Sequence, residues 1–325
     1  MRPAGEGDGR RDDGGVRRMN QRDRMSGTGG VLIAALLWGT TGTAATFAPE
    51  VSPVAIGAVA MGVGGLLQAL IALRGIIRSR VSLRQNGGML LTGALAVGIY
   101  PLAFYASMHL AGVTVGTVIS IGSAPLLSAL IEYCLDGQRL TRRWMTGAAV
   151  GVIGMVLLCV AENANHASTA QQSDVIIGIA LGLLAGLTYA LYSWAARHLM
   201  QRGIPSRTAM GATFGLGGIL LMPVLFATGA PLLASMTNAA VGIYMALIPM
   251  FIGYVCYGYG LARIPASLAT TLTLLEPAVA ALLAVMIVGE RLPVMGWIGI
   301  GLILGCLIVI TAPAKRARTV TARTY

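Results

Sequence analysis

The sequence predicts an all-α membrane protein with ten transmembrane helices, arranged as two inverted repeats of five helices each. The first reason is composition: 56% of the 325 residues are hydrophobic and 11% are charged, against about 25% charged in ordinary soluble domains. The second is that ten apolar stretches each approach the roughly 20 residues needed to cross the hydrocarbon of a bilayer. The third is an internal match between the two halves at a fixed offset of 152 residues.

The internal match depends on residue types that are scarce in apolar segments. The matching pairs are Tyr105 and Tyr257, Pro125 and Pro277, Gly137 and Gly289, Arg139 and Arg291, and Leu140 and Leu292. A chance alignment of biased sequence is the alternative, and the Tyr, Pro and Arg pairs argue against it. Because each repeat holds an odd number of spans, the second copy enters the bilayer upside down, which is a layout of secondary transporters.

The expected spans follow the apolar stretches in order. They cover residues 29–47, 53–73, 88–109, 113–134, 145–161, 175–196, 207–228, 239–261, 265–288 and 294–312. Residues 1–28 lack an apolar period and are predicted to form a disordered basic tail, with Met1, Met19 and Met25 as alternative starts. The first repeat is then 29–161, followed by an external loop at 162–174, the second repeat at 175–312 and a basic cytoplasmic tail at 313–325.

A cleavable secretory signal is the alternative interpretation of the first span, because an Arg-rich start precedes an apolar run and small residues. Its loss would leave nine spans and break the internal match. We therefore expect the first span to be retained.

The placement of basic residues predicts the orientation. With the N-terminus in the cytoplasm, 22 of the 23 Lys and Arg residues lie in cytoplasmic tails and loops, and Arg291 lies outside. The positive-inside rule then supports ten spans with both ends cytoplasmic. We expect a multi-pass protein of a bacterial-type inner membrane.

Several function classes do not fit this composition. A net charge of +11 would suit a nucleic-acid-binding protein if the basic residues gathered on one folded face, but here they are spread over separate loops, so no nucleic-acid partner is expected. The chain has three histidines, four widely spaced cysteines and no phosphate-binding loop or hydrolase motif. We therefore expect no enzyme, cofactor or metal site. Uphill transport would have to draw on an ion or substrate gradient.

Glu276 is predicted to be the acidic residue at mid-bilayer. Burial disfavours an ionised carboxyl, which suits a proton relay or a contact for a cationic substrate. The alternative starts from Pro277, which leaves the carbonyl of Thr273 without its helical donor; a neutral Glu276 could donate to a freed carbonyl nearby and have no further role. At the 152-residue offset Glu276 matches Ala124, so the charge belongs to one half only, as a site for an asymmetric molecule requires.

Hydroxyl and aromatic side chains supply the other candidate site residues. Ser120 belongs to a stripe of hydroxyls three residues apart on span 113–134, which can face a cavity, and Thr273 lies one turn before Glu276. Bonding of such hydroxyls back to their own helix is the alternative. Apolar rings with polar tips suit a path for a small amphipathic solute, and the candidates are Trp38, Tyr105, Tyr189 and Tyr257. Tyrosines near the expected span ends are predicted to lie at the lipid interface, namely Tyr100, Tyr133 and Tyr244.

Pro125 and Pro277 lie near the centres of the fourth and ninth spans and are predicted to break both helices. Transporters built from inverted repeats place their binding sites at such midplane breaks. Ordinary helix kinks are the alternative.

These residues also carry a resemblance to a known family. The run Leu36-Leu37-Trp38-Gly39-Thr40, the prolines of spans four and nine, and Gly289-Glu290-Arg291-Leu292 resemble the EamA-type ten-helix exporters of the drug/metabolite transporter superfamily, over residues 29–312. The first half departs from the family pattern at Gln138, where the family often has Glu. The resemblance implies an inner-membrane secondary carrier, often one that exports amino acids or related metabolites.

The sequence therefore predicts a secondary active transporter that exports a small metabolite, such as an amino acid or a related amphipathic compound, by alternating access. Its expected partners are the small-molecule substrate, the lipid bilayer and protons as coupling ion. A passive channel or facilitator is the alternative, and it would need a continuous polar pore. A non-transporting membrane scaffold is a further alternative, which would be expected to carry a folded soluble domain or long structured loops.

Overall fold

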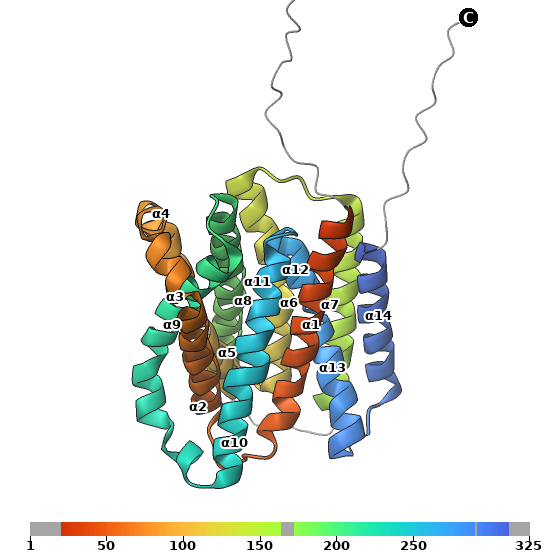
Figure 1. Cartoon of the computed structure of the whole chain (residues 1–325). Helices are drawn as coiled ribbons and strands as arrows, with labels where there is room; N and C mark the ends of the chain where they lie inside the picture. Colours follow the sequence, from red (N-terminus) through yellow and green to blue (C-terminus); the bar gives the residue numbers. More distant parts are fainter. Residues whose placement is uncertain (1–20, 164–171, 290, 312–325) are drawn as a thin grey trace, which may run out of the picture.

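The computed structural model describes residues 21–163, 172–289 and 291–311, and within these ranges it is built of helices without strands (Figure 1). Ten of its helical segments are long and apolar enough to cross a membrane. The prediction of an all-α protein with ten spans in two repeats is confirmed. Each predicted span overlaps one of these segments.

The first repeat contains five spans. They are α1 (Gln21–Ala45); α2 (Pro53–Gly57) continued by the π-helical turn η1 (Ala58–Val63) and α3 (Gly64–Arg78); α5 (Gly87–Ala111); α6 (Val113–Asp136); and α7 (Arg142–Asn163). The short helix α4 (Arg80–Gln85) joins the second and third spans.

The second repeat also contains five. They are α8 (Gln172–Gln201); α9 (Ser206–Thr228); α10 (Met236–Met245) continued by the π-helical turn η3 (Ala246–Ile252) and α11 (Gly253–Leu261); α12 (Ala266–Leu272), α13 (Leu275–Leu283) and the π-helical turn η4 (Ala284–Val288); and α14 (Val294–Thr311). A 3-10 turn, η2 (Ala230–Leu233), precedes α10.

The first helix begins earlier than the sequence predicts. The predicted disordered tail includes residues 21–28, but these residues form the first two turns of α1, so this part of the prediction is wrong. A tertiary contact supports this start: a Cβ added to Gly27 would lie 3.3 Å from the carbonyl oxygen of Gly260, at the end of α11, and 2.7 Å from the Cβ of Arg263, just after that helix. The rest of the predicted tail at 1–20, most of the predicted loop at 162–174, the tail at 313–325 and Glu290 lie outside the described residues.

Helix packing follows the internal repeat. In the first repeat α5 packs on α8, and in the second the matching segment, α11 with η3, packs on α1. Likewise α6 packs on α8 while its counterpart α13 packs on α1, and the matching pairs α3/α9 and α7/α14 pack on each other. This exchange of partners is the pattern of an inverted repeat with a pseudo-twofold axis in the membrane plane.

The two halves meet closely where side chains are absent. At the α7/α14 crossing, a Cβ added to Gly299 would lie 2.5 Å from the carbonyl oxygen of Gly154, so neither residue can carry a side chain without moving the helices. Such contacts suit packing inside lipid, where no hydrophobic force drives helices together.

The start of α1 and the end of α14 lie at the same face of the bundle, at the top of Figure 1. We call this the terminal face and the opposite one, which carries the link between α1 and α2, the far face. Large apolar side chains are exposed along the helices, among them Leu36, Leu91, Leu130, Ile177 and Ile308. Such a surface is compatible with contact to lipid chains rather than water.

Candidate transport cavity

A cavity of about 600 Å³ lies between the two repeats. Its walls are the second half of α1, the link to α2, the end of α5, the first half of α6, and α13 with η4. Since α1 and α5 end at the far face and α6 begins there, the cavity occupies the half of the protein nearer that face. It is not fully enclosed.

Four of the predicted site residues line this one cavity: Trp38, Tyr105, Glu276 and Pro277. They come from three helices that are far apart in the sequence. Gly39 brings two of these helices together, because a Cβ on it would lie 2.9 Å from the carbonyl oxygen of Glu276. The first turn of α13 therefore sits directly against α1, beside Trp38.

A hydrogen bond from the indole N–H and contacts of the indole ring hold the Trp38 side chain in place. The indole Nε1 donates to the carbonyl oxygen of Pro249 at 2.9 Å, which lies inside η3. The ring lies 4.7 Å from that of Tyr254 and 5.3 Å from that of Tyr257, measured between centroids. The side chain is 4% exposed. Trp38 thus borders the cavity on one side and a group of tyrosines on the other.

Glu276 stands in the first turn of α13. Its carboxyl makes no hydrogen bond with any of the described residues, whereas its backbone N–H donates to the carbonyl of Thr273 at 2.9 Å. That bond satisfies the carbonyl which Pro277 deprives of its donor, so the carboxyl is not needed for this purpose. A carboxylate at the start of a helix is favoured by the helix dipole, and here it faces the cavity.

The two prolines act differently. The ninth span is interrupted at Thr273 and Leu274, between α12 and α13, just before Pro277. The fourth span is not: α6 runs unbroken from Val113 to Asp136 through Pro125, so the predicted break at Pro125 is wrong. One lost hydrogen bond costs less than exposing more backbone groups to a medium without water, and flanking turns can hold the helix together.

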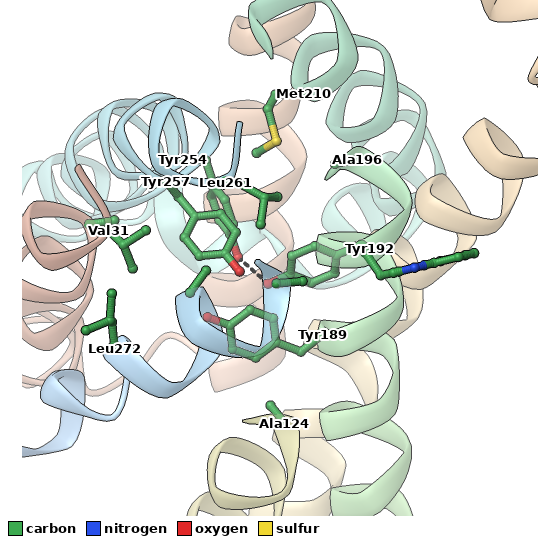
Figure 2. Close-up of a cluster of buried hydrophobic side chains, with 14 of the residues drawn as sticks. Val31, Ala124, Tyr189, Tyr192, Ala196, Met210, Tyr254, Tyr257, Leu261 and Leu272 are labelled. Atoms are coloured by element: carbon green, nitrogen blue, oxygen red, sulfur yellow. Dashed lines mark hydrogen bonds between the residues drawn. The ribbon is translucent and has the colours of Figure 1, made fainter. Parts of the chain in front are cut away.

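Three predicted residues lie behind the cavity wall rather than in it. The hydroxyls of Tyr189 and Thr273 are hydrogen-bonded at 2.9 Å, and those of Tyr257 and Ser193 at 2.8 Å. A third bond joins the hydroxyls of Tyr192 and Tyr254 at 2.9 Å. Figure 2 shows the rings of α8 and α11 turned toward one another.

We call this group of rings the aromatic layer: Tyr100, Tyr189, Tyr192, Phe214, Tyr254 and Tyr257. It lies beyond Trp38, on the terminal-face side of the cavity. The prediction that Tyr100 lies at the lipid interface is wrong, since its ring centroid is 5.6 Å from that of Tyr189. Tyr100 stands in the middle of α5, where the helix is covered by α8. The hydroxyl of Tyr244 bonds that of Thr40 at 2.7 Å, and its place at the lipid interface stays a prediction.

Ser120 is fully buried, and its Oγ has no hydrogen-bond partner among the described residues. In this region α6 packs on α8: a Cβ on Gly186 would lie 2.9 Å from the carbonyl oxygen of Ser120. Within the predicted hydroxyl stripe Thr117 lines the cavity. The stripe therefore turns from the cavity toward α8 as it follows the helix.

Sequence reasoning missed a second buried acid, Glu132, which is 1% exposed. Its carboxylate accepts hydrogen bonds from the backbone N–H of Ala266 at 2.6 Å, from that of Ser267 at 3.2 Å, and from the Ser267 hydroxyl. An acidic residue inside predicted span 113–134 was the available signal. Its position near the end of that span made a solvated carboxyl equally compatible with the sequence.

Family comparison agrees with this architecture. The model of the EamA-like transporter family matches residues 25–160 and 176–312, one match in each repeat. The chain belongs to the EamA-like transporter family. It is a multi-pass membrane transporter, and a lipid bilayer and a small-molecule substrate follow from that assignment.

Several curated relatives of this EamA-like transporter align over most of its length. The uncharacterized transporter YwfM of Bacillus subtilis is 31% identical over 90% of this chain and 96% of its own. A protein of Streptantibioticus cattleyicolor named as a probable terminal-alkyne amino-acid exporter is 27% identical over 82% and 90%. Protein PecM of Dickeya dadantii is 29% identical over 67% and 71%.

A solved crystal structure of a protein superimposes with a TM-score of 0.72 at 21% sequence identity, covering 88% of this chain and 96% of that one. This likeness shows the shared fold. The family and relatives indicate a transporter rather than an enzyme.

Proposed function

We propose that this EamA-like transporter is a secondary active carrier that exports a small amphipathic metabolite bearing an amine, such as an amino acid or a related compound, by alternating access. One observation carries the proposal. The cavity between the repeats is walled mainly by apolar and aromatic side chains together with four threonines, and Glu276 is the single charged residue among the described residues that line it.

The wall chemistry favours a cationic group. A carboxylate in a largely apolar cavity pairs strongly with an ammonium group, and the rings of Trp38, Phe104 and Tyr105 offer further attraction to a cation. Because no Lys or Arg lines the cavity within the described residues, an anionic solute would have no countercharge there. The apolar wall then accommodates the rest of the molecule, and the relative named as an amino-acid exporter agrees with this class.

The proposed orientation places the terminal face in the cytoplasm of a bacterial-type inner membrane. It rests on the positive-inside rule and on the 22 basic residues assigned to that side. The cavity of the present structure then reaches toward the outside, while the aromatic layer stands between it and the cytoplasm. Such closure on one side is expected of a carrier and would block a continuous channel.

Proton coupling is proposed through competition for Glu276. A proton and an ammonium group cannot both neutralise the same carboxylate, so a proton entering from outside would displace the exported amine. The carboxyl is suited to this exchange, because the described residues offer it no permanent hydrogen-bond partner.

Counterflow in proteoliposomes tests the proposal. Radiolabelled amino acids and the corresponding monoamines should exchange saturably, and their N-acetylated forms should not. Replacing Glu276 with Gln should reduce proton-coupled flux at least tenfold while the protein stays folded. Glu50→Gln is a matched control, since Glu50 is exposed on the link between α1 and α2 and does not line the cavity. Unchanged flux and pH dependence in Glu276→Gln would end the coupling proposal, and non-saturating passage would favour a channel.

A further inference from the structure

We propose that Glu132 is a latch between the two repeats, which holds the terminal face closed and favours the conformation whose cavity reaches the far face. This inference rests on the proposed alternating access, but it concerns how the two conformations are balanced rather than what is carried. Glu132 is a positioning residue, because it does not line the cavity.

The contact joins two segments that alternating access must separate. Glu132 stands near the end of α6, in the first repeat, and its partners Ala266 and Ser267 open α12, in the second. The Glu132 carboxylate accepts hydrogen bonds from the first two backbone N–H groups of α12 and from the Ser267 hydroxyl. Those N–H groups have no partner within their own helix. If this contact opened while it stayed buried, both the N–H groups and the carboxylate would lose their hydrogen-bond partners.

Neighbouring bonds close the same region. The indole of Trp194 donates to Asp136 at 2.9 Å, joining α8 to the end of α6. The Arg197 guanidinium donates to the backbone carbonyls of Leu261, at 2.7 Å, and of Ile264, joining α8 to the link between α11 and α12. These two contacts tie α8 to the two segments that Glu132 connects. Three charged residues, Glu132, Asp136 and Arg197, thus hold together the ends of α6, α8 and α11 and the start of α12 at the terminal face.

The repeat lacks this device at the other face. At the 152-residue offset Glu132 corresponds to Ala284, and Ala266 and Ser267 correspond to Thr114 and Val115. The equivalent junction at the far face would therefore bring the start of α6 to η4 with a methyl group in place of the carboxylate. In the present structure the cavity lies at that junction, since both Ala284 and Thr117 line it.

This asymmetry predicts a bias. In an inverted repeat, closing the far face brings together the segments that correspond to the terminal-face junction. In this protein the far-face junction would form without a charged contact, because Ala284 stands where Glu132 stands in the other repeat. Gln at position 132 can accept one of the N–H groups, but its NH₂ would meet another donor. Since hydrogen bonds to charged groups are among the stronger ones in proteins, Glu132→Gln should raise the population open at the terminal face about tenfold or more.

Thiol labelling in nanodiscs, without substrate, tests the latch. Ser128 is fully buried and lies one helical turn before Glu132, on the same side of α6. In a background with Cys134, Cys256 and the cavity-lining Cys159 replaced by Ser, we expect Ser128→Cys to react with N-ethylmaleimide at least tenfold faster when Glu132→Gln is added. Ala280→Cys, on the cavity wall, should react more slowly in the same variant. Glu50→Gln serves as the carboxylate control and should change neither rate.

The opposite movement of the two rates separates a latch from a merely structural role, since general loosening would accelerate both. If Glu132→Gln does not fold, Ser267→Ala, which removes only the hydroxyl donor, should shift both rates in the same directions by a smaller factor. Unchanged rates, or acceleration at both cysteines, would overturn the proposal. The labelling requires no transport, so a failure to carry amines would refute the proposed substrate class and leave the latch standing.

Discussion

Replacing Trp38 with Phe should destabilise the protein by about 1.5–2.5 kcal/mol, for reasons that can be worked from its contacts. The indole N–H bonded to the Pro249 carbonyl would be lost, and the loss of one buried hydrogen bond costs about 0.5–1.5 kcal/mol. The smaller ring would also leave a space beside Tyr254 and Tyr257. A residual void of about 40 Å³, at ~24 cal/mol per Å³, adds roughly 1 kcal/mol.

The matched control is Trp297→Phe. Trp297 is 49% exposed on α14, and its indole makes no hydrogen bond with the described residues, so the same chemical change should alter stability by less than about 0.5 kcal/mol. The free energy of unfolding of both variants is measured by equilibrium denaturation in mixed micelles. If Trp38→Phe costs no more than Trp297→Phe, the indole donor does not hold α1 to η3, and the role given to Trp38 at the side of the cavity is refuted.

Two further predictions test the packing and the topology. Gly299→Ala should destabilise the protein by about 1–3 kcal/mol through overpacking, because its Cβ would meet the Gly154 carbonyl. The control Gly301→Ala on the same helix meets nothing within 4 Å and should be neutral or slightly stabilising. Equal thermal unfolding of the two variants would contradict the close crossing of α7 and α14. Single cysteines at Gln138 and Arg291, which follow the matching spans of the two repeats, should be labelled by an impermeant reagent from opposite sides of the membrane. Labelling from one side would rule out an inverted repeat.

The number of spans and their approximate bounds were predictable from the sequence, because each depends on a local property. A segment in lipid must satisfy its backbone groups internally and must be long enough to cross, so apolar length alone identifies it. The repeat was predictable for a similar reason: pairs such as Tyr105/Tyr257 and Pro125/Pro277 are visible without knowing what they touch. The beginning of α1 was not, since Gly27 within residues 21–28 packs against the end of α11.

The candidate site was predictable in part. Residue type singled out Glu276 and Trp38, and both line the cavity, because a buried acid and an indole are rare enough in such a sequence to be noticed. Tyr189 and Tyr257 have the same chemistry as Tyr105, yet only Tyr105 lines the cavity while the other two belong to the aromatic layer. Side-chain chemistry cannot distinguish these positions, since the difference is the angle at which each helix faces its neighbours.

Apolar length, charge placement and the repeated residues of this chain determined by themselves that it crosses the membrane ten times in two related halves. Only the tertiary structure decided which polar groups meet. Glu132 bonds a residue 134 positions away and Trp38 one 211 positions away, and such contacts arise from helix packing between the repeats. Hydrophobic periodicity acts within one helix, whereas the pairing of buried donors and acceptors depends on which helices are neighbours, and that is a property of the whole assembled bundle.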